Sequence, residues 1–348
     1  MRDSIFYSAA RALAVAFCVV LGLSLGFAFL TVMIGAMSGG VSSDGNLSTV
    51  NTEEILPNAS GVRKKLSGDS PVILQVNISG VIGMENLDSK SIRQQLVESR
   101  EEGLKNDRVK ALLLYINTPG GTVSDADGIF RALMAYKKKY STPIYAYVDG
   151  LCASGGIYVA LAADKVFASD TSLIGSVGVI APTFMNLTKL LDKVGVETLT
   201  ISEGKGKDAM NPLRPWKEGE DANYRQIIEY YYGHFVDLVT THRPAITKEL
   251  LVKEYGARIF PAPLAQEYGF IDASNASLGE TIEALAQAAD LAPDTYQVIR
   301  LENKNWWSSL FSSKASALFS GKMKHQLSLS PELDLMVSNQ FLYLYSPQ

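Results

Sequence analysis

Apolar residues in the middle of the chain alternate between strand-like and helix-like patterns. Apolar residues recur at every second position in 72–78 (Val72, Leu74, Val76 and Ile78), as in a strand, while 109–117 (VKALLLYIN) is the near-continuous apolar run of a strand buried on both faces. Between these two strands lies a charged stretch in which apolar residues recur at Ile92, Leu96 and Leu104, which indicates a helix. The pattern therefore predicts a sheet with helices packed against it.

The same alternation continues towards the C-terminus. The further predicted elements are a helix at 122–139, a strand at 143–148, a helix opened by residues 151–164 (LCASGGIYVALAAD), strands near 165–169 and 173–181, a helix at 185–194, a strand at 197–202 and a long helix at about 217–242. Strands and helices interleaved in this way are typical of an α/β fold with a mainly parallel sheet. No convincing internal repeat is present, so residues 71–302 are predicted to form one globular domain.

The N-terminal region contains one long apolar stretch. Residues 13–37 carry no charge, and these 25 residues can cross a hydrocarbon core of about 30 Å as a helix that rises about 1.5 Å per residue. A cleaved signal peptide is the alternative, but its apolar core is shorter, about 7–15 residues, and no convincing small-residue cleavage site follows. We therefore predict a transmembrane anchor.

The charges on either side of this stretch predict its orientation. Arg2 and Arg11 precede it, whereas the first charged residues after it are acidic. The positive-inside rule then places residues 1–12 in the cytoplasm as a short N-terminus. The bulk of the chain is expected to lie on the other side of the membrane.

Two segments flank the predicted domain. Residues 38–70 are rich in Gly, Ser and Asn with no sustained apolar period, which is typical of a flexible linker. In the tail, residues 303–348, large apolar residues recur among lysines and suggest an amphipathic helix. Such a helix would pack on the domain or on a neighbouring subunit, or would lie on a membrane surface; a disordered tail is the third possibility.

The amino-acid composition argues against several classes of function. The formal net charge is −4 and 20% of the residues are charged, so the chain lacks the excess of basic residues that is typical of nucleic-acid-binding proteins. The two cysteines, Cys18 and Cys152, lie far apart along the chain, and the three histidines show no metal-binding spacing such as H-E-x-x-H. We therefore expect no nucleic acid, no metal ion and no cofactor.

Two glycine-rich turns follow predicted strands. In residues 116–123 (INTPGGTV), two glycines allow backbone N–H groups to approach a ligand, although many simple turns look alike. Ser154 precedes Gly155 and Gly156 at the start of a predicted helix. A serine there is most often an N-cap. The same position also suits a nucleophile, because the following amide and the helix N-terminus can stabilise an oxyanion.

A serine nucleophile needs a base. His234, with Asp237 three residues further on, lies on a helix rich in polar residues, where the pair more readily forms a solvated face. Lys205 and Lys207 lie in the loop 202–213 (SEGKGKDAMNPL). Loop lysines are normally exposed and charged, and a lysine acts as a base only where burial lowers its pKa from about 10.4 towards about 7–8. A lysine base therefore requires a dry pocket around the amine.

Four motifs, taken together and in this order, resemble those of a known peptidase family. They are INTPGG, ASGGIYVALAADKVFA, SLIGSVGVI and GKGKDAMNP. Over residues 71–292 the chain is similar to the signal peptide peptidase (SppA) family, S49-type serine endopeptidases with a Ser/Lys dyad, in the short form that carries one catalytic copy. The resemblance implies degradation of remnant signal peptides through an acyl-enzyme.

The resemblance also implies roles for individual residues. Ser154 matches the nucleophile, Lys207 matches the general base, and Ser176 matches the serine that orients the lysine amine; Lys205 has no counterpart in that role. In the family the dyad is completed across a subunit interface, so Lys207 is expected to serve the serine of a neighbouring copy.

The oxyanion hole is implied in the same way. The PGG turn matches the oxyanion-hole loop, so the expected donors are the N–H groups of Gly121 and Gly155, with Gly120 as the alternative to Gly121. The implied fold is a ClpP/crotonase-like spiral of ββα units behind the N-terminal transmembrane helix. The implied assembly is a homo-oligomeric ring such as an octamer, in a bacterial inner membrane with the catalytic domain on the periplasmic side.

Two rival functions follow from the same fold. A crotonase-like enzyme would process acyl-CoA thioesters with a similar oxyanion hole, but coenzyme A substrates are cytoplasmic and the domain is expected outside. A non-catalytic membrane scaffold would bind partners without cleaving them, but it would have no need of the complete set Ser154, Ser176 and Lys207. A membrane-anchored serine endopeptidase is therefore the preferred hypothesis.

Overall fold

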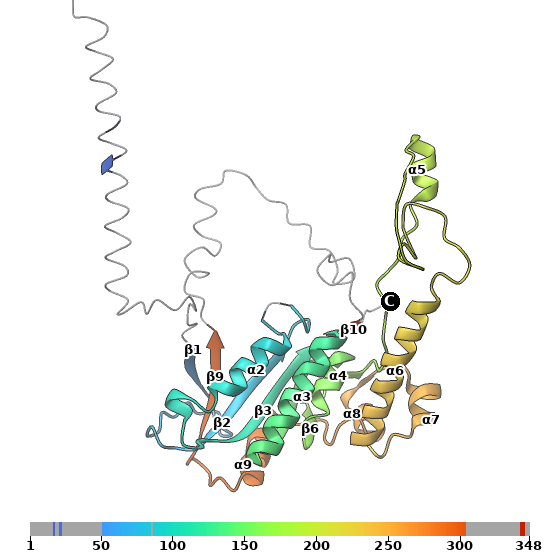
Figure 1. The fold of residues 1–348 in the computed structure, drawn as a ribbon. Coiled ribbons are helices and arrows are strands. Elements are labelled where there is room, and N and C mark those ends of the chain that lie inside the picture. The colour runs from blue at the N-terminus through green and yellow to red at the C-terminus, as the bar shows by residue number, and fades with distance from the viewer. Residues whose placement is uncertain (1–16, 18–20, 23–50, 85, 304–341, 345–348) are drawn as a thin grey trace, which may run out of the picture. The chain divides into compact units, whose positions relative to one another are not determined.

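The computed structural model describes residues 17, 21–22, 51–84, 86–303 and 342–344. The chain divides into two units, Met1–Thr49 and Val50–Gln348, and the fold below is that of the second (Figure 1). The predicted anchor at 13–37 lies outside the described residues, apart from residues 17, 21 and 22. Among the residues that are described, none of the helices combines the length and the apolar character that crossing a membrane requires.

An eight-stranded sheet organises the second unit. Its strand order is β1-β9-β2-β3-β5-β7-β8, with β6 paired to β5. The strands are β1 (Asn51–Leu56), β2 (Val72–Ser79), β3 (Val109–Thr118), β5 (Ile144–Ala153), β6 (Lys165–Ala168), β7 (Leu173–Gly175), β8 (Ile259–Pro261) and β9 (Gln297–Asn303). From β9 to β7 neighbouring strands are parallel, and only the edge strands β1 and β8 pair antiparallel. The prediction of an α/β fold with a mainly parallel sheet is therefore confirmed.

Helices cover both faces of the sheet. They are α2 (Ser89–Glu98), α3 (Val123–Tyr140), α4 (Gly155–Ala160), α5 (Thr188–Val194), α6 (Ala222–His242), α7 (Lys248–Leu250), α8 (Ala262–Glu267) and α9 (Leu278–Ala288), with single turns at η1 (Glu102–Leu104) and η2 (Leu251–Tyr255). Because side chains alternate across a strand, Leu74 and Val76 of β2 belong to the same core as Ile129 of α3, whereas Ile73 packs with Ile282 of α9. This arrangement explains why the central strands are apolar on both faces.

The structure differs from the sequence prediction in two flanking regions. β1 lies within the 38–70 range assigned to a linker, and it pairs with β9 at the edge of the sheet. In the predicted tail, residues 342–344 form β10 (Leu342–Leu344), which pairs with the short strand β4 (Gly120–Thr122). The rest of the tail predicted as an amphipathic helix, apart from residue 303, lies outside the described residues.

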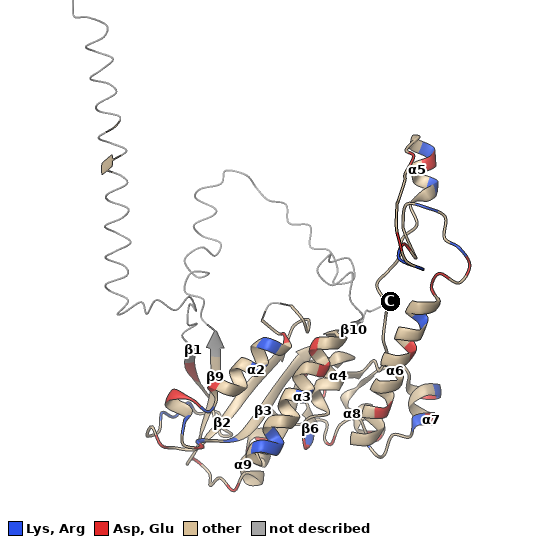
Figure 2. Cartoon of the chain, viewed as in Figure 1, with Lys and Arg blue, Asp and Glu red and all other residues tan. Residues whose placement is uncertain are grey.

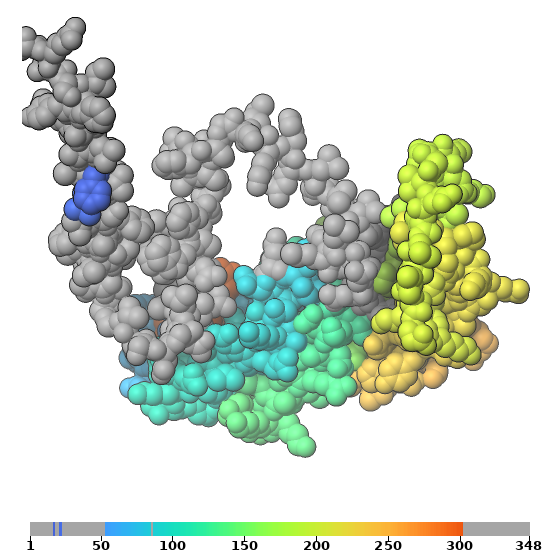
Figure 3. Space-filling view, turned by 45° about the horizontal axis from the view of Figure 1, so that its top comes forward, coloured from blue at the N-terminus to red at the C-terminus, as the bar shows by residue number. Residues whose placement is uncertain are grey.

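The predicted strand at 197–202 is wrong. These residues have no regular secondary structure, and Leu199 and Ile201 are 86% and 89% exposed. A segment with alternating apolar residues forms a strand only where another strand is available to pair with it, and no described strand pairs with this one. Figure 3 shows the segment that contains α5 and these residues in yellow-green.

Candidate active site

Ser154 lies at the turn between β5 and α4. The strand ends where Ala153 pairs with Gly175 of β7, and the Ser154 N–H donates to the Gly175 carbonyl at 2.9 Å. The backbone then adopts φ 52° and ψ −112°, a conformation that favours glycine. The side chain is buried, at 1% exposed. A buried serine in a strained strand-to-helix turn is similar in geometry to the turn that carries the nucleophile in α/β-hydrolases.

The Ser154 hydroxyl does not cap the helix. Ser154 is the residue before α4, but its side chain accepts no helix N–H; instead Oγ donates to the Gly178 carbonyl at 3.4 Å. The N–H of Gly155, the first residue of α4, can have no partner within the helix. α4 itself carries no charged side chain (Figure 2). The hydroxyl is therefore not used for N-capping, and a nearby amide points out of the helix start.

Ser176 lies beside Ser154 at the end of the next strand. It follows β7, is 5% exposed, and has a positive φ of 59°. Its N–H donates to the Arg258 carbonyl at 2.7 Å. Gly175 is required here, because a Cβ on it would lie 2.4 Å from that same carbonyl. The structure thus brings the two predicted serines to adjacent strand ends.

The PGG turn packs against the start of α4, next to Ser154. The Gly120 N–H donates to Thr118 Oγ1 at 3.0 Å, while a Cβ on Gly121 would lie 1.9 Å from the carbonyl oxygen of Ile82. Gly156 of α4 approaches Thr118 so closely that a Cβ on it would lie 2.7 Å from the threonine methyl. Only glycine permits these approaches, so the turn and the start of α4 are held together.

The outer edge of β4 is paired with a segment from far along the chain. The Ile82 N–H donates to the Gly120 carbonyl and the Thr122 N–H to the Ile82 carbonyl, so the peptide groups of Gly121 face the opposite side. There β10 pairs antiparallel, with Tyr343 opposite Gly121, and β10 also contacts α4. The edge beside Ser154 can therefore accept an extended polypeptide.

A pocket opens next to Ser154. Its volume is about 490 Å³, and its wall includes Val177, Gly178 and Val179 on one side and Ile228 and Tyr232 of α6 on the other. Gly178 is the residue whose carbonyl accepts from the Ser154 hydroxyl. The sequence motif GSVGVI indicated this segment, but only the fold places α6 opposite to it. Arg225 and Glu229 also line the pocket, but the remaining wall is mainly apolar and suits an apolar side chain.

Lys207 is exposed, and among the residues that the structure describes no hydrogen bond joins its amine to Ser154 or Ser176. Lys205 is exposed as well. The dry pocket that a lysine base requires is therefore not formed around Lys207 within one chain.

The other candidate nucleophiles and bases have different environments. His234 is exposed, and Asp237 forms an ion pair with Lys248 at 2.8 Å, as expected for a solvated helix face. Burial raises the pKa of the Cys152 thiol to about 12, so this neighbour of Ser154 stays protonated. Within the described ranges, no group of three or more His, Cys, Asp or Glu side chains is placed to hold a metal ion.

Two family models, both of proteases, match parts of the chain. A family model for peptidase family S49 matches residues 136–292, and one for Clp protease matches residues 82–174. A protein of Synechocystis sp. that is named as a protease is 30% identical over 300 residues, which cover 84% of this chain and 99% of that protein.

Two further relatives carry more specific names. A protein of Enterococcus faecium named as a signal peptide peptidase SppA is 29% identical over 269 residues, 73% of this chain and 76% of that protein. The chloroplastic serine protease SPPA of Arabidopsis thaliana is 28% identical over 261 residues, 72% of this chain and 37% of that protein. Among solved structures, a Listeria monocytogenes ClpP1 mutant matches with a TM-score of 0.40 at 17% identity, covering 62% of this chain and 96% of that one, a likeness too distant to carry a conclusion.

Proposed function

The chain belongs to peptidase family S49 and is a serine protease with a ClpP-like α/β fold, and on that premise we propose that it is a membrane-anchored endopeptidase that uses Ser154 as nucleophile and Lys207 as general base. The proposed substrates are cleaved signal peptides and similar polypeptides. The proposed detail of the fold is a spiral of ββα units.

One observation carries this proposal. The start of α4, with Ser154 before it, contacts β4, and β4 holds an extended segment antiparallel along its edge at Gly121. Proteases bind substrates in extended form, since main-chain pairing gives affinity for any sequence and presents each carbonyl in a regular register. A peptide in the place of β10 would lie along β4 with its side chains alternating, and the apolar pocket beside Ser154 would hold one of them.

The proposed chemistry proceeds by acyl transfer. The neutral amine of Lys207 takes the proton from Ser154 Oγ as this oxygen bonds to the substrate carbonyl carbon, and the N–H groups of Gly121 and Gly155 stabilise the resulting oxyanion. The lysine then returns the proton to the departing amine nitrogen as the C–N bond breaks. Water, activated by the same amine, releases the acyl group. Ser176 would hold the amine in place through its hydroxyl.

The lysine is proposed to reach its serine in an assembly. Lys207 is exposed in the single chain, whereas a base must lose its charge through burial. The same segment exposes large apolar side chains to an unusual extent: Met185, Leu190, Val194, Leu199 and Ile201. Contiguous apolar exposure of this kind suits a protein interface. We therefore favour a homo-oligomeric ring, such as an octamer, in which this segment covers the Ser154 site of the next copy.

The anchor and the location are proposed from the sequence. The uncharged residues 13–37, with Arg2 and Arg11 before them, support a single span with the domain on the periplasmic side of a bacterial inner membrane. Substrates released within that membrane would then reach the domain directly.

Covalent labelling tests the dyad. The detergent-solubilised protein is treated with a fluorophosphonate probe as wild type, Ser154→Ala, Lys207→Ala and Lys205→Ala, the last being a matched control two residues from the proposed base. We expect labelling of wild type and Lys205→Ala, none of Ser154→Ala, and a fall of about 100-fold or more in Lys207→Ala. Equal labelling of Lys207→Ala and wild type would exclude the lysine base, and a wild type that never labels would favour the scaffold function.

A pH profile provides a second test. A lysine base works only in its neutral form, so the labelling rate should rise with pH between 6 and 9. A flat profile over this range would argue against a lysine base even if Ser154 is the labelled residue.

A further inference from the structure

The segment that carries Lys207 has no strand or helix to hold it. Around Lys207 the backbone is supported by single turns, in which the Lys207 N–H donates to the Gly204 carbonyl and the Ala209 N–H to the Gly206 carbonyl, both at 3.1 Å. Single turns open readily, because each is stabilised by one hydrogen bond and little burial. A base on such a segment needs additional contacts if it is to stay in position.

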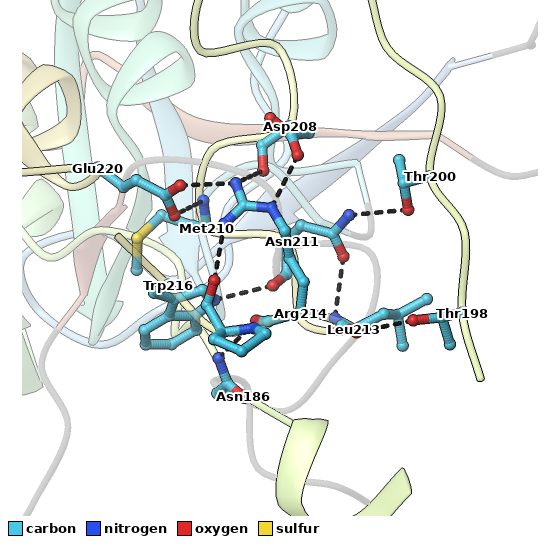
Figure 4. A network of polar contacts seen from close by, with 11 residues as sticks. Asn186, Thr198, Thr200, Asp208, Met210, Asn211, Leu213, Arg214, Trp216 and Glu220 are labelled. Carbon is cyan, nitrogen blue, oxygen red and sulfur yellow. Dashed lines mark hydrogen bonds and ion pairs between the residues drawn. The ribbon is translucent and has the colours of Figure 1, made fainter. Parts of the chain in front are cut away.

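Arg214 supplies those contacts to the residue after Lys207. Its Nε donates to the Asp208 carboxylate at 2.8 Å, and its Nη2 donates to the Asp208 backbone carbonyl, also at 2.8 Å (Figure 4). The planar guanidinium presents its N–H groups in a fixed fork. Bonds to the side chain and the carbonyl of one residue therefore fix Asp208 and the peptide unit that joins it to Ala209.

The same guanidinium also contacts Glu220, two residues before the first residue of α6. Arg214 forms an ion pair with Glu220 at 2.6 Å, and the other Glu220 oxygen accepts from the Met210 N–H at 3.4 Å. Met210 has a positive φ of 58°, so this contact supports a backbone conformation that a side chain disfavours. Through Arg214 and Glu220, the Lys207 turn is connected to the helix that borders the pocket next to Ser154.

The cluster keeps its charges at neutral pH. Hydrogen bonds from Arg214 hold the pKa of the Asp208 and Glu220 carboxyls below their usual values. The side chains of Arg214 and Glu220 are only 22% and 12% exposed, so solvent screens the pair less than it screens a fully exposed one. Both carboxylates therefore remain acceptors over the range in which a lysine base would work.

We propose that Arg214 is a positioning residue for Lys207. By holding the carboxylate and the carbonyl of Asp208, it fixes the turn so that the amine of Lys207 is presented in one orientation to the serine it activates. This inference rests on the proposed function, in which Lys207 is the base. A misplacement of a catalytic group by about 1 Å costs about 100-fold in rate, so the loss of this anchor should be measurable.

The test compares variants in the full-length, detergent-solubilised protein. Arg214→Ala removes the anchor, and Arg214→Lys keeps the charge but cannot bond the carboxylate and the carbonyl together. Asp208→Asn keeps the carbonyl acceptor and weakens the side-chain bond. The matched control is Arg300→Ala, which breaks the similarly shielded ion pair with Glu54 between β9 and β1. Each variant is assayed for the rate of fluorophosphonate labelling, for kcat and KM on a peptide ester, and for Tm.

The expected result separates rate from binding. In Arg214→Ala, kcat and the labelling rate should fall about 10–100-fold while KM changes by less than about threefold, since the base acts only on the chemical step. Arg214→Lys should lose most of that activity, Asp208→Asn less, and Arg300→Ala none. Millimolar guanidinium chloride, compared with equal sodium chloride, should restore part of the activity of Arg214→Ala. Such rescue distinguishes a missing guanidinium from a general loss of structure.

The other possible outcomes overturn either the positioning role of Arg214 or the role of Lys207 as general base. Wild-type kcat in a folded Arg214→Ala, or full activity in Arg214→Lys, overturns the positioning role. If Arg214→Ala does not fold, the folded Arg214→Lys decides in the same way. Lys207→Ala is measured in the same experiments. If it is as active as wild type, both the role of Lys207 as general base and the positioning role of Arg214 are refuted. If it is inactive while the Arg214 variants are fully active, only the positioning role is refuted.

Discussion

Ser154 and Ser176 follow adjacent parallel strands in matching register. Ala153 pairs with Gly175, and the Ser154 N–H donates to the Gly175 carbonyl at 2.9 Å, so each serine is the next residue after a paired strand end. Both are buried and both have a positive φ. Polar side chains at the carboxyl ends of neighbouring parallel strands converge, which is how a parallel sheet builds a site from distant motifs.

The strained turn at Ser154 predicts a stability difference between two inactive variants. A backbone at φ 52° and ψ −112° costs a residue with a Cβ about 1–3 kcal/mol, and glycine escapes this cost apart from a larger entropy loss of about 0.5–1 kcal/mol. Ser154→Gly should therefore unfold at a Tm about 2–4 °C above that of Ser154→Ala. Calorimetry of both variants measures this, and a Ser154→Ala protein at least as stable as Ser154→Gly would contradict the strain.

The close approach at Gly121 predicts a destabilising substitution. A Cβ there would lie 1.9 Å from the Ile82 carbonyl oxygen, a backbone atom that can move only with its strand. Gly121→Ala should lower the free energy of unfolding by about 1–3 kcal/mol and should reduce labelling of Ser154, since β4 must shift. Gly233→Ala, on α6 with no atom within 4 Å, is the control and should be neutral or slightly stabilising. Urea unfolding with parallel labelling checks both.

The pairing of β10 predicts that substrate access depends on residue 343. Tyr343 lies opposite Gly121, so its N–H faces β4, whereas that of Leu342 faces away. Tyr343→Pro removes this donor, and the loss of about 0.5–1.5 kcal/mol should raise the labelling rate of Ser154 about two- to tenfold. Leu342→Pro should have a smaller effect. Equal rates in wild type and Tyr343→Pro would mean that the segment does not compete for the edge of β4.

The buried Cys152 thiol predicts resistance to alkylation. Burial raises its pKa to about 12, so at pH 8 almost none of it is the reactive thiolate. Iodoacetamide should leave Cys152 unmodified in the folded protein and should modify it fully in concentrated urea, as judged by mass spectrometry of the peptide that contains it. Rapid modification under native conditions, with loss of labelling at Ser154, would show that the site is open to solvent at this point.

The Arg214 cluster predicts a stability contribution that disappears in acid. Arg214 lowers the pKa of Asp208 and Glu220, so the folded state binds protons less readily than the unfolded state. The contribution is therefore complete above the unfolded pKa values of about 4 and is lost as the pH falls through the lowered folded values. The difference in urea midpoint between wild type and Arg214→Ala should be constant from pH 8 to pH 5 and should shrink below about pH 4. A difference that grows in acid would have the wrong sign.

The predicted fold was correct where one-dimensional patterns are strong. The structure has β2 at the alternating residues 72–78 and β3 at the apolar run 109–117. Both could be predicted because the burial of a strand requires apolar residues at regular short spacing. The alternation at 197–202 resembles that at 72–78, but no described strand pairs with it. Likewise, the polar segment that contains β1 gave little local signal, because an edge strand is stabilised by its partner β9.

The amino-acid sequence by itself determined the succession of strands and helices and the motifs that identify a serine peptidase, since both are encoded by residue type at short spacing. Only the tertiary structure decided that Ser154, Ser176 and the PGG turn meet, that β10 occupies the edge of β4, and that Lys207 stays exposed in one chain. Strand order and register bring together residues that are distant along the chain, and no local pattern records which strands become neighbours.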